Sequence, residues 1–477
     1  MRKDERCFPA ATAVALILVI LLATACGSSA TTTSIDDSAP SITTTTPTNS
    51  APGPPADQEQ LTAKALAVLD AFVAEDYEAV HQTFDETMKT ALPLPKLQEV
   101  WEQVTDQAGS YIGNTGVRTE EVDGYQAIIV QAQFKNAPLD VRVVFDQTGL
   151  VAGLFFQAAE TSYKPPPYVK TEAFTSREIT VVNGHWELPG TLTLPVAEEL
   201  LPGIVLVHGS GPNDRNETIG PNQPFRDLAE GLASIGVAVL RYDKRTLVYA
   251  QETVANADLT LNEETVDDAV AAFRLLRGLP EIDPARCFVL GHSLGGYALP
   301  RIGALTTQAA GFVIMAGAAR PLEDLILEQM EYIYSLNSSP TEQETANMAA
   351  VREQVQRVKD SALSYSTPAH DLPLNIPATY WLDLRDYDPP LAAATLARPT
   401  LVLQGGRDYQ VTEADLRLWE AALSTVPGCS FTLYPELNHL FMEGQGKSIP
   451  SDYLRQGHMA EVVIKDIGTW IDQFRQP

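Results

Sequence analysis

The chain has 477 residues and a formal net charge of -28, from 33 Lys and Arg against 61 Asp and Glu. Its length favours two folded domains over one, and its 45% hydrophobic and 20% charged residues exclude disorder as the general state. The negative charge repels nucleic-acid phosphates and anionic lipid headgroups. It therefore excludes binding to DNA, RNA or a membrane surface through charge.

The first 26 residues have the layout of a secretory signal, with a charged start and an apolar stretch from Ala10 to Ala25. This stretch is short for a membrane-spanning helix. Residues 23–29 (ATACGSS) resemble a bacterial lipobox. The resemblance predicts that Cys26 is lipidated and holds the protein at the extracellular face of the cell membrane. The alternatives are ordinary secretion after cleavage nearby and an uncleaved amino-terminal anchor.

Residues 27–58 are rich in Ser, Thr and Pro and have almost no apolar anchors, so we expect a flexible linker. A small α+β domain is predicted over residues 59–160. Its helical apolar pattern runs from Leu61 to Val80, and a second helix is expected near Leu97 to Val104. Period-two strands follow at Tyr125–Phe134, Leu139–Phe145 and Leu150–Phe156. In its order of helices before sheet, the domain resembles the uncharacterised NTF2-like domain that precedes many secreted bacterial hydrolase domains.

A second domain is predicted over residues 171–477, after a break at Pro165 to Pro167. From Ile204 on, most strand-like runs are nearly unbroken apolar stretches separated by helical segments. This pattern is typical of a parallel sheet buried on both faces, hence an α/β fold. The expected strands are Glu178–Val182, Thr191–Val196, Ile204–His208, Val237–Tyr242, Cys287–Leu290, Gly311–Ala316, Thr400–Gln404 and Phe431–Tyr434. Residues 320–398 are too long for a simple crossover and are predicted to form a helical lid.

A candidate nucleophile lies in residues 291–295 (GHSLG), which follow a predicted strand and open a predicted helix. This is the setting of a nucleophile elbow, where small residues on both sides of the serine permit a sharp, strained turn. The pattern alone is weak because Gly and Ser are common. Its position between strand and helix makes Ser293 the predicted nucleophile.

A serine hydroxyl needs an imidazole to take its proton, and the imidazole needs a carboxylate to fix its tautomer. In the order typical of nucleophile-elbow enzymes, the acid and then the histidine follow the serine. His439 is favoured because it lies in the loop past the last predicted strand, whereas His458 introduces the helix expected over Ala460 to Phe474.

Asp408 is the favoured acid because it follows the strand Thr400–Gln404 through a pair of glycines. This spacing is expected to place its carboxylate at the sheet edge beside the elbow. Asp383, Asp386 and Asp388 are competitors, but they precede that strand and are interpreted as pocket-lining or helix-capping residues.

Two backbone amides are expected to stabilise the oxyanion of the transition state. Leu294 supplies one, and the loop at residues 208–212 (HGSGP) supplies the other, from Ser210 or, as the less favoured alternative, Gly211. Further residues expected to border the reacting atoms are His208, Gly209, Gly211 and His292.

Five segments together carry a family resemblance. They are HGSGPNDR at 208–215, RYDKR at 241–245, GHSLGG at 291–296, GGRD at 405–408 and NH at 438–439. They resemble bacterial secreted α/β-hydrolase esterases, akin to the dienelactone-hydrolase and acyl-CoA-thioesterase-like branches. The resemblance implies hydrolysis of short-chain carboxylic esters by Ser293, Asp408 and His439. Dienelactone hydrolases have a cysteine at the nucleophile position, so the serine here argues against that substrate.

Four charged residues near these motifs are interpreted as structural ion pairs: Asp214, Arg215, Asp243 and Arg245. Cys287 and Cys429 open apolar runs and are predicted to be buried free thiols, and the sequence contains no metal-binding cysteine pair.

The leading hypothesis is therefore an esterase that forms an acyl-enzyme, with a small-molecule ester as substrate and no cofactor or metal. Its contact with a membrane is expected only through Cys26. An exopeptidase, a thioesterase or an acyltransferase would use the same residues. The alternative from another class is an envelope binding protein in which the hydrolase fold has lost its chemistry.

Overall fold

The computed structural model describes residues 56–122, 125–135, 137–159, 163–337 and 340–475. The predicted signal, the lipobox with Cys26 and all but the last residues of the predicted linker lie outside these ranges. None of the helices in the described ranges has the length and apolar character needed to cross a membrane. The chain divides into two compact units between Glu160 and Thr161, and each is described by itself.

The small unit begins with four helices, α1 (Ala56–Val73), α2 (Tyr77–Gln82), α3 (Glu86–Ala91) and α4 (Leu94–Ala108). The helix expected from Leu61 to Val80 is thus broken into two. Glu75 has a φ of 57°, and Asp76 caps the second helix by accepting a hydrogen bond from the Ala79 amide at 3.0 Å. An Asp at this position satisfies an orphan amide of a new helix, which favours the break.

An antiparallel meander follows the helices, in the order β1 (Tyr111–Val122), β2 (Tyr125–Phe134), β3 (Pro138–Phe145) and β4 (Val151–Ala158). The helices pack their apolar residues against this sheet, around Phe72, Trp101 and Phe156. Strand β1 was not predicted. It contains two glycines and shifts its register twice, between Tyr111 and Gly113 and between Asn114 and Gly116, which disrupts a period-two pattern.

The second unit is built on an eight-stranded sheet in the order β12-β11-β10-β9-β7-β8-β6-β5. Its strands are β5 (Phe174–Asn183), β6 (Trp186–Pro195), β7 (Leu201–Val207), β8 (Ala238–Tyr242), β9 (Ile282–His292), β10 (Gly311–Met315), β11 (Thr400–Gly405) and β12 (Ser430–Tyr434). Among the described strands of this sheet, β6 pairs antiparallel with both β5 and β8, and the other neighbouring pairs are parallel. The predicted eight-stranded, mostly parallel sheet is confirmed.

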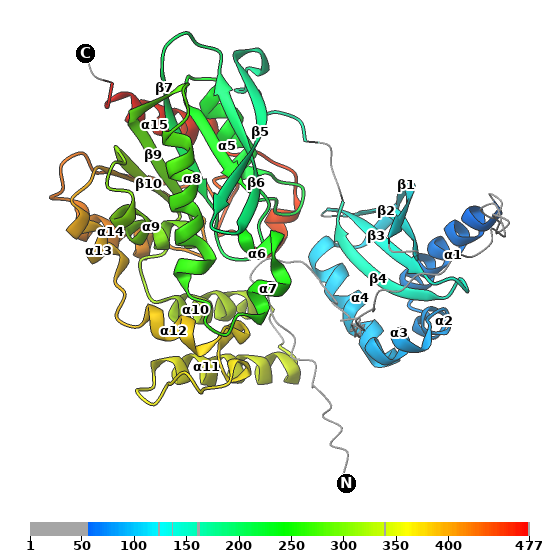
Figure 1. Ribbon diagram of the computed structural model, residues 1–477. Helices are drawn as coiled ribbons and strands as arrows, with labels where there is room; N and C mark the ends of the chain where they lie inside the picture. Colours follow the sequence, from blue (N-terminus) through cyan, green and yellow to red (C-terminus); the bar gives the residue numbers. More distant parts are fainter. Residues whose placement is uncertain (1–55, 123–124, 136, 160–162, 338–339, 476–477) are drawn as a thin grey trace, which may run out of the picture. The chain divides into compact units, whose positions relative to one another are not determined.

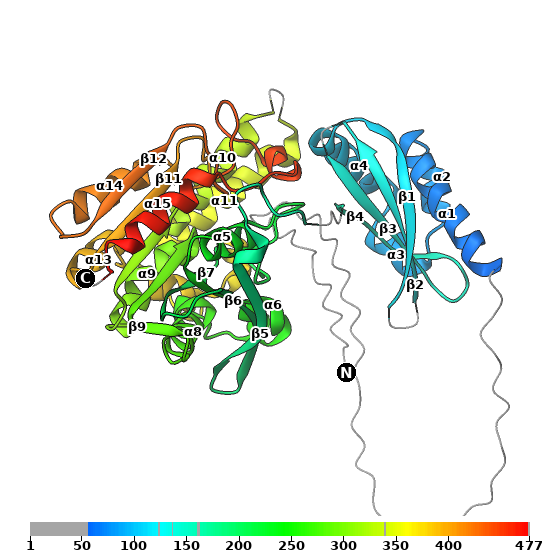
Figure 2. The same ribbon diagram turned by 90° about the horizontal axis from the view of Figure 1, so that it is seen from above.

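Helices cover both faces of this sheet (Figures 1 and 2). On one face, α5 (Pro224–Ala233) and α15 (Glu461–Asp472) enclose a core with Phe225, Phe288 and Trp470. On the other lie α8 (Asp267–Arg277), α9 (Leu294–Leu305) and α14 (Glu413–Leu423), around Phe273 and Trp419. Burial on both faces explains why the central strands are continuous apolar runs.

The long insertion between β10 and β11 contains α10 (Leu322–Ser335), α11 (Glu342–Lys359), α12 (Ala378–Leu384) and α13 (Pro389–Leu396). Helices α10, α11 and α12 lie together below one end of the sheet in Figure 1, whereas α13 packs on α9 and α14. The insertion is attached to the body of the unit. Asp383 pairs with Arg301 of α9 at 2.7 Å, and Gln329 donates to the Gln410 carbonyl at 2.8 Å.

Candidate active site

Ser293 lies in the turn between β9 and α9, with a φ of 54° and a ψ of -116°. Such a conformation is strained for a residue with a side chain and is typical of a nucleophile elbow. A Cβ on Gly291 would collide with the backbone of Gly295, and a Cβ on Gly295 would collide with the Val207 carbonyl. Only glycine fits at both positions, and this lets strand, turn and helix approach closely enough to present the serine.

Asp408 and His439 come from the ends of neighbouring strands. Asp408 lies just past β11 and His439 in the loop after β12, and both are buried. His439 Nδ1 and Asp408 Oδ2 are 2.7 Å apart, a hydrogen bond in which the imidazole donates to the carboxylate. The other oxygen, Oδ1, accepts from the amides of Gln410 at 2.7 Å and Val411 at 3.2 Å. The carboxylate is therefore held in one orientation toward the imidazole.

The elbow adjoins the His439 loop through the residue before the nucleophile. The rings of His292 and His439 lie 4.7 Å apart between centroids, and His292 Nε2 is 2.9 Å from the His439 carbonyl oxygen. Between the described side chains of Ser293 and His439 there is no hydrogen bond. Hydrogen bonds of this kind often tighten only when substrate is bound.

The loop after β7 passes directly beside Ser293. A Cβ on Gly209 would lie 3.1 Å from Ser293 Cβ and 3.6 Å from Ser293 Oγ, so a glycine gives the serine side chain room. The Gly209 amide already donates to Glu217 Oε1 at 2.7 Å. Nothing in the described chain accepts from the amides of Ser210 or Leu294, which leaves these two donors for an oxyanion.

These features match a known family. Residues 204–447 match the model of the alpha/beta hydrolase family. The chain belongs to this family. Residues 65–154, in the small unit, match a family described as a protein of unknown function.

Among curated proteins, the hydrolase is 38% identical over 418 residues to "Esterase EstD" of Thermotoga maritima, covering 86% of this chain and 94% of that protein. Among solved structures, it is similar to the esterase domain of a Rhodothermus marinus protein, with 17% identity and a TM-score of 0.38 over 63% of this chain and 98% of that one. It is also similar to Est1E from Butyrivibrio proteoclasticus, with 16% identity and a TM-score of 0.39 over 62% and 98% of the two chains.

Glu217 is a part of the hydrolase site that sequence reasoning missed. Its side chain is buried, and its Oε2 lies 2.9 Å from His292 Nδ1, an ion-pair contact without the angle of a linear hydrogen bond. Burial lowers the pKa of His292, but the Glu217 carboxylate outweighs it and the net pKa is raised. Burial alone would raise the pKa of Glu217. The neighbouring His292 ring and the hydrogen bond from the Gly209 amide lower it by more, so the pKa lies below its ordinary value.

His208 is the first residue of the loop after β7 and takes no part in the Asp408 to His439 pair. Its ring packs on Phe225 at 4.9 Å and edge-on to Tyr242 at 5.4 Å between centroids. Burial lowers the pKa of His208 to about 4, so the ring is neutral near pH 7. It is a packing residue of the α5 side of the sheet.

The remaining charged candidates have structural partners. Arg215 pairs with Asp243 at 2.8 Å, whereas Arg245 pairs with Asp268 at 2.5 Å. Asp214 forms no ion pair with a described residue and instead accepts from the amide and hydroxyl of Thr218, both at 2.8 Å, so its interpretation as an ion-pair residue is wrong.

The alternatives to Asp408 and His439 also have partners of their own. Asp388 caps α13 through the Leu391 amide at 2.9 Å, and His458 Nδ1 lies 3.1 Å from Asp227. The structure thus brings Asp408, and none of these alternatives, to His439.

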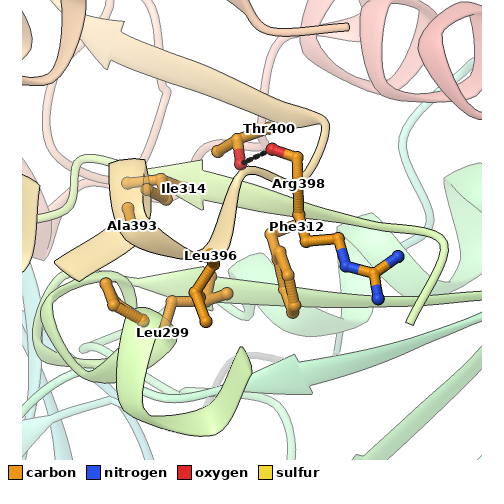
Figure 3. Close-up of a pocket in the computed structure, with 8 residues that line it drawn as sticks. Leu299, Phe312, Ile314, Ala393, Leu396, Arg398 and Thr400 are labelled. Atoms are coloured by element: carbon orange, nitrogen blue, oxygen red, sulfur yellow. Dashed lines mark hydrogen bonds between the residues drawn. The ribbon is translucent and has the colours of Figure 1, made fainter. Parts of the chain in front are cut away.

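The free cysteines and a small hollow lie apart from this site. Cys287 is buried as predicted, but Cys429 is half-buried because it lies just before the edge strand β12. The hollow lies among α9, β10, β11 and α13 and is lined mainly by apolar residues such as Leu299, Phe312 and Leu396 (Figure 3). The described residues contain no group of His, Cys, Asp and Glu able to hold a metal ion.

Proposed function

We propose that this hydrolase is an esterase that cleaves short-chain carboxylic esters through an acyl-enzyme on Ser293. The observation that carries the proposal is the 2.7 Å hydrogen bond between His439 and Asp408 beside a strained serine turn. The 38% identity to a protein named an esterase supports the choice of ester over amide or thioester.

The proposed reaction has two steps. Ser293 Oγ attacks the ester carbonyl carbon while its proton passes to Nε2 of His439, and the carbonyl oxygen gains negative charge beside the Ser210 and Leu294 amides. His439 then gives the proton to the departing alcohol, and the acyl group stays on Ser293. Water then gives a proton to His439 and attacks the acyl carbon; the bond from that carbon to Ser293 Oγ breaks, His439 returns the proton to Oγ, and the carboxylic acid leaves. Asp408 holds the proton on Nδ1 throughout, so that Nε2 can act as the base.

The preference for short acyl chains is supported by side chains that follow the acid and the histidine. Tyr409 and Leu440 are buried in one apolar cluster with Tyr332 and Ile333 of α10. The rings of Tyr332 and Tyr409 stack with centroids 5.1 Å apart. These side chains fill space next to Asp408 and His439, and we therefore expect a long acyl chain to fit poorly there.

A fluorophosphonate should form one covalent adduct with the folded protein, located on Ser293 by peptide mass spectrometry. The adduct should abolish hydrolysis of p-nitrophenyl acetate, because it occupies the oxygen that attacks the ester. Without inhibitor, kcat/KM should be highest for the acetate and butyrate esters and fall as the acyl chain lengthens.

The matched control is Ser293→Ala, which should neither be labelled nor hydrolyse ester while keeping the wild-type circular dichroism spectrum. A wild-type protein that is folded yet unlabelled would contradict the enzymatic function. A higher kcat/KM for aminoacyl p-nitroanilides than for the esters would instead indicate a peptidase.

We further propose that Cys26 carries a lipid that holds the protein at the extracellular face of the membrane, as the lipobox resemblance at residues 23–29 implies. Replacing it, as Cys26→Ala, should move the protein from the membrane fraction to the medium, because the remaining chain has a net charge that disfavours anionic lipid. The measurement is immunoblotting of both fractions. A Cys26→Ala protein that stays in the membrane fraction would argue against the lipid anchor.

A further inference from the structure

A buried lysine reaches the loop that lies beside the nucleophile. Lys244 lies two residues past the end of β8, and its side chain is 3% exposed. Its Nζ donates to the Gly209 carbonyl at 2.9 Å and to Glu264 Oε1 at 2.6 Å. Burying an ammonium group destabilises the folded protein unless the charge is paired. The buried charge at this loop therefore indicates a specific role there.

Three successive carbonyls of this loop, those of Gly209, Ser210 and Gly211, accept hydrogen bonds from residues 213 and 244–246. Asn213 Nδ2 lies 3.2 Å from the Gly209 oxygen and 3.0 Å from the Ser210 oxygen. Thr246 Oγ1 donates to the Gly211 oxygen at 2.9 Å. In a trans peptide the C=O and the following N–H point in opposite directions. The Ser210 amide therefore points away from Lys244.

The Gly209 to Ser210 peptide is thus held at its carbonyl by an ammonium group. Hydrogen bonding at one end of a peptide polarises the other end, and a charged donor does so most strongly in a buried site. The Ser210 N–H has no acceptor in the described chain. The hydrogen bond from Lys244 to the carbonyl of the same peptide increases the partial positive charge on this N–H.

The same lysine is connected to the inserted helices. Glu264, in the π-helical turn Asn262–Val266, accepts from Lys244 with one oxygen and from the Tyr380 hydroxyl with the other, at 2.7 Å. Tyr380 belongs to α12 and is buried. Burial, then the Glu264 carboxylate, raises the pKa of Tyr380, so the hydroxyl keeps its proton and donates it.

We propose that Lys244 is a positioning residue for the oxyanion, and that Glu264 and Tyr380 couple the α12 helix of the insertion to it. Lys244 aims and polarises the Ser210 amide, Glu264 fixes Lys244, and Tyr380 fixes Glu264. The inference rests on the proposed function, since it assigns these residues to the transition state of that reaction.

The test uses the full chain with Lys244→Met and Glu264→Gln combined. The pair is replaced together because a single replacement would leave one buried charge without a partner. Loss of a whole oxyanion donor lowers kcat by on the order of 10²- to 10³-fold, and loss of its polarisation alone should cost about tenfold. KM for p-nitrophenyl acetate should stay within about twofold, and Ki for an aryl trifluoromethyl ketone should rise about tenfold, because that adduct carries an oxyanion.

The matched control is the neighbouring buried pair, combined as Arg245→Met and Asp268→Asn. These side chains are 7% and 2% exposed and do not contact the loop, so kcat and Ki should stay near wild type. A folded Lys244→Met/Glu264→Gln protein with kcat and Ki within about twofold of wild type would overturn the proposal. So would equal losses in the two double variants, because the effect would then be general to buried pairs.

A milder comparison decides the matter if the Lys244 double variant does not fold. Tyr380→Phe removes the hydroxyl that donates to Glu264. Tyr387→Phe is its control: it removes a hydroxyl that donates to the Tyr297 carbonyl at 3.1 Å and does not contact Glu264. We expect kcat to fall about threefold for Tyr380→Phe, with a parallel rise in the ketone Ki, and neither to change for Tyr387→Phe. Equal effects would overturn the coupling.

Each measurement begins with wild-type protein that is labelled on Ser293 and hydrolyses ester. If the wild type does neither, the proposed function has failed and the inference fails with it. If the wild type is active and the variants behave like it, only the inference has failed.

Discussion

Replacing Asp408 with Asn should lower kcat for ester hydrolysis by about 10⁴-fold and leave the fold intact. The reason lies in the contacts of the carboxylate. Its Oδ1 accepts from two backbone amides, and its Oδ2 accepts from His439 at 2.7 Å and from the Gln404 side-chain amide at 3.2 Å. Backbone amides can only donate, so the oxygen of an asparagine must take the Oδ1 position.

The amide nitrogen of the new asparagine side chain would then face His439 and donate to Nδ1. The imidazole would carry its proton on Nε2, the atom that has to accept the proton of Ser293, so the dominant tautomer could not act as a base. KM for p-nitrophenyl acetate should change little because Asp408 does not contact the substrate in the proposed reaction. Steady-state kinetics of the purified variant measure both quantities.

Asp383→Asn is the matched control, because Asp383 was a sequence competitor for the acid position and its carboxylate pairs instead with Arg301 at 2.7 Å. Its kcat should stay within a few fold of wild type. A folded Asp408→Asn protein that keeps more than about a tenth of the wild-type kcat would show that His439 does not depend on this carboxylate.

The main parts of the sheet and of the site could be predicted because each leaves a local pattern. A buried strand is a continuous apolar run, and a nucleophile elbow needs small residues two positions before and after Ser293. Asp408 and His439 follow strands that the same patterns locate. Each of these predictions depends on a few neighbouring residues in the chain.

Glu217 and Lys244 could not be predicted, because nothing near them in sequence shows what they contact. Glu217 meets His292, 75 residues further along the chain, and Lys244 meets Gly209, 35 residues earlier. A charged residue in a loop is most often solvated, and only the fold shows that these two are buried. Lys244 stands between Asp243 and Arg245, whose pattern in the sequence indicates structural ion pairs and gives no sign that Lys244 reaches Gly209.

The contacts of His292 indicate that its ring is positively charged. Its Nε2 lies 2.9 Å from the His439 carbonyl oxygen, which can only accept, and its Nδ1 faces the Glu217 carboxylate at 2.9 Å. Two acceptors on opposite sides favour an imidazolium with both nitrogens protonated. Glu217 thereby ties the oxyanion loop, through the Gly209 amide, to the loop that carries His439.

Replacing Glu217 with Ala should reduce the free energy of unfolding at pH 6 by about 3–5 kcal/mol, because it leaves a buried histidine charge and the Gly209 amide without partners. Urea denaturation followed by circular dichroism measures this difference. Glu461→Ala is a suitable control: Glu461 pairs with Lys465 at 2.7 Å and both side chains are more than half exposed, so removing that pair should cost no more than about 1 kcal/mol. A loss from Glu217→Ala no larger than that of the control would contradict a buried ion pair at this position.

The isosteric Glu217→Gln variant should separate charge from hydrogen bonding by its pH dependence. The pKa of His292 is raised by folding, so protonation of its ring stabilises the folded protein. This contribution to the free energy of unfolding is fully present below pH 6.5, the ordinary pKa of histidine, and is lost as the pH rises through the raised pKa. The pKa of Glu217 is lowered by folding, so its ionised carboxylate stabilises the folded protein. This contribution is present above pH 4.5, the ordinary pKa of glutamate, and is lost as the pH falls through the lowered pKa. The wild type should therefore exceed Glu217→Gln in stability most between about pH 4.5 and 6.5, and this advantage should shrink toward pH 9. A stability difference that stays constant from pH 6 to pH 9 would mean that His292 is neutral and that Glu217 acts only as a hydrogen-bond acceptor for Gly209.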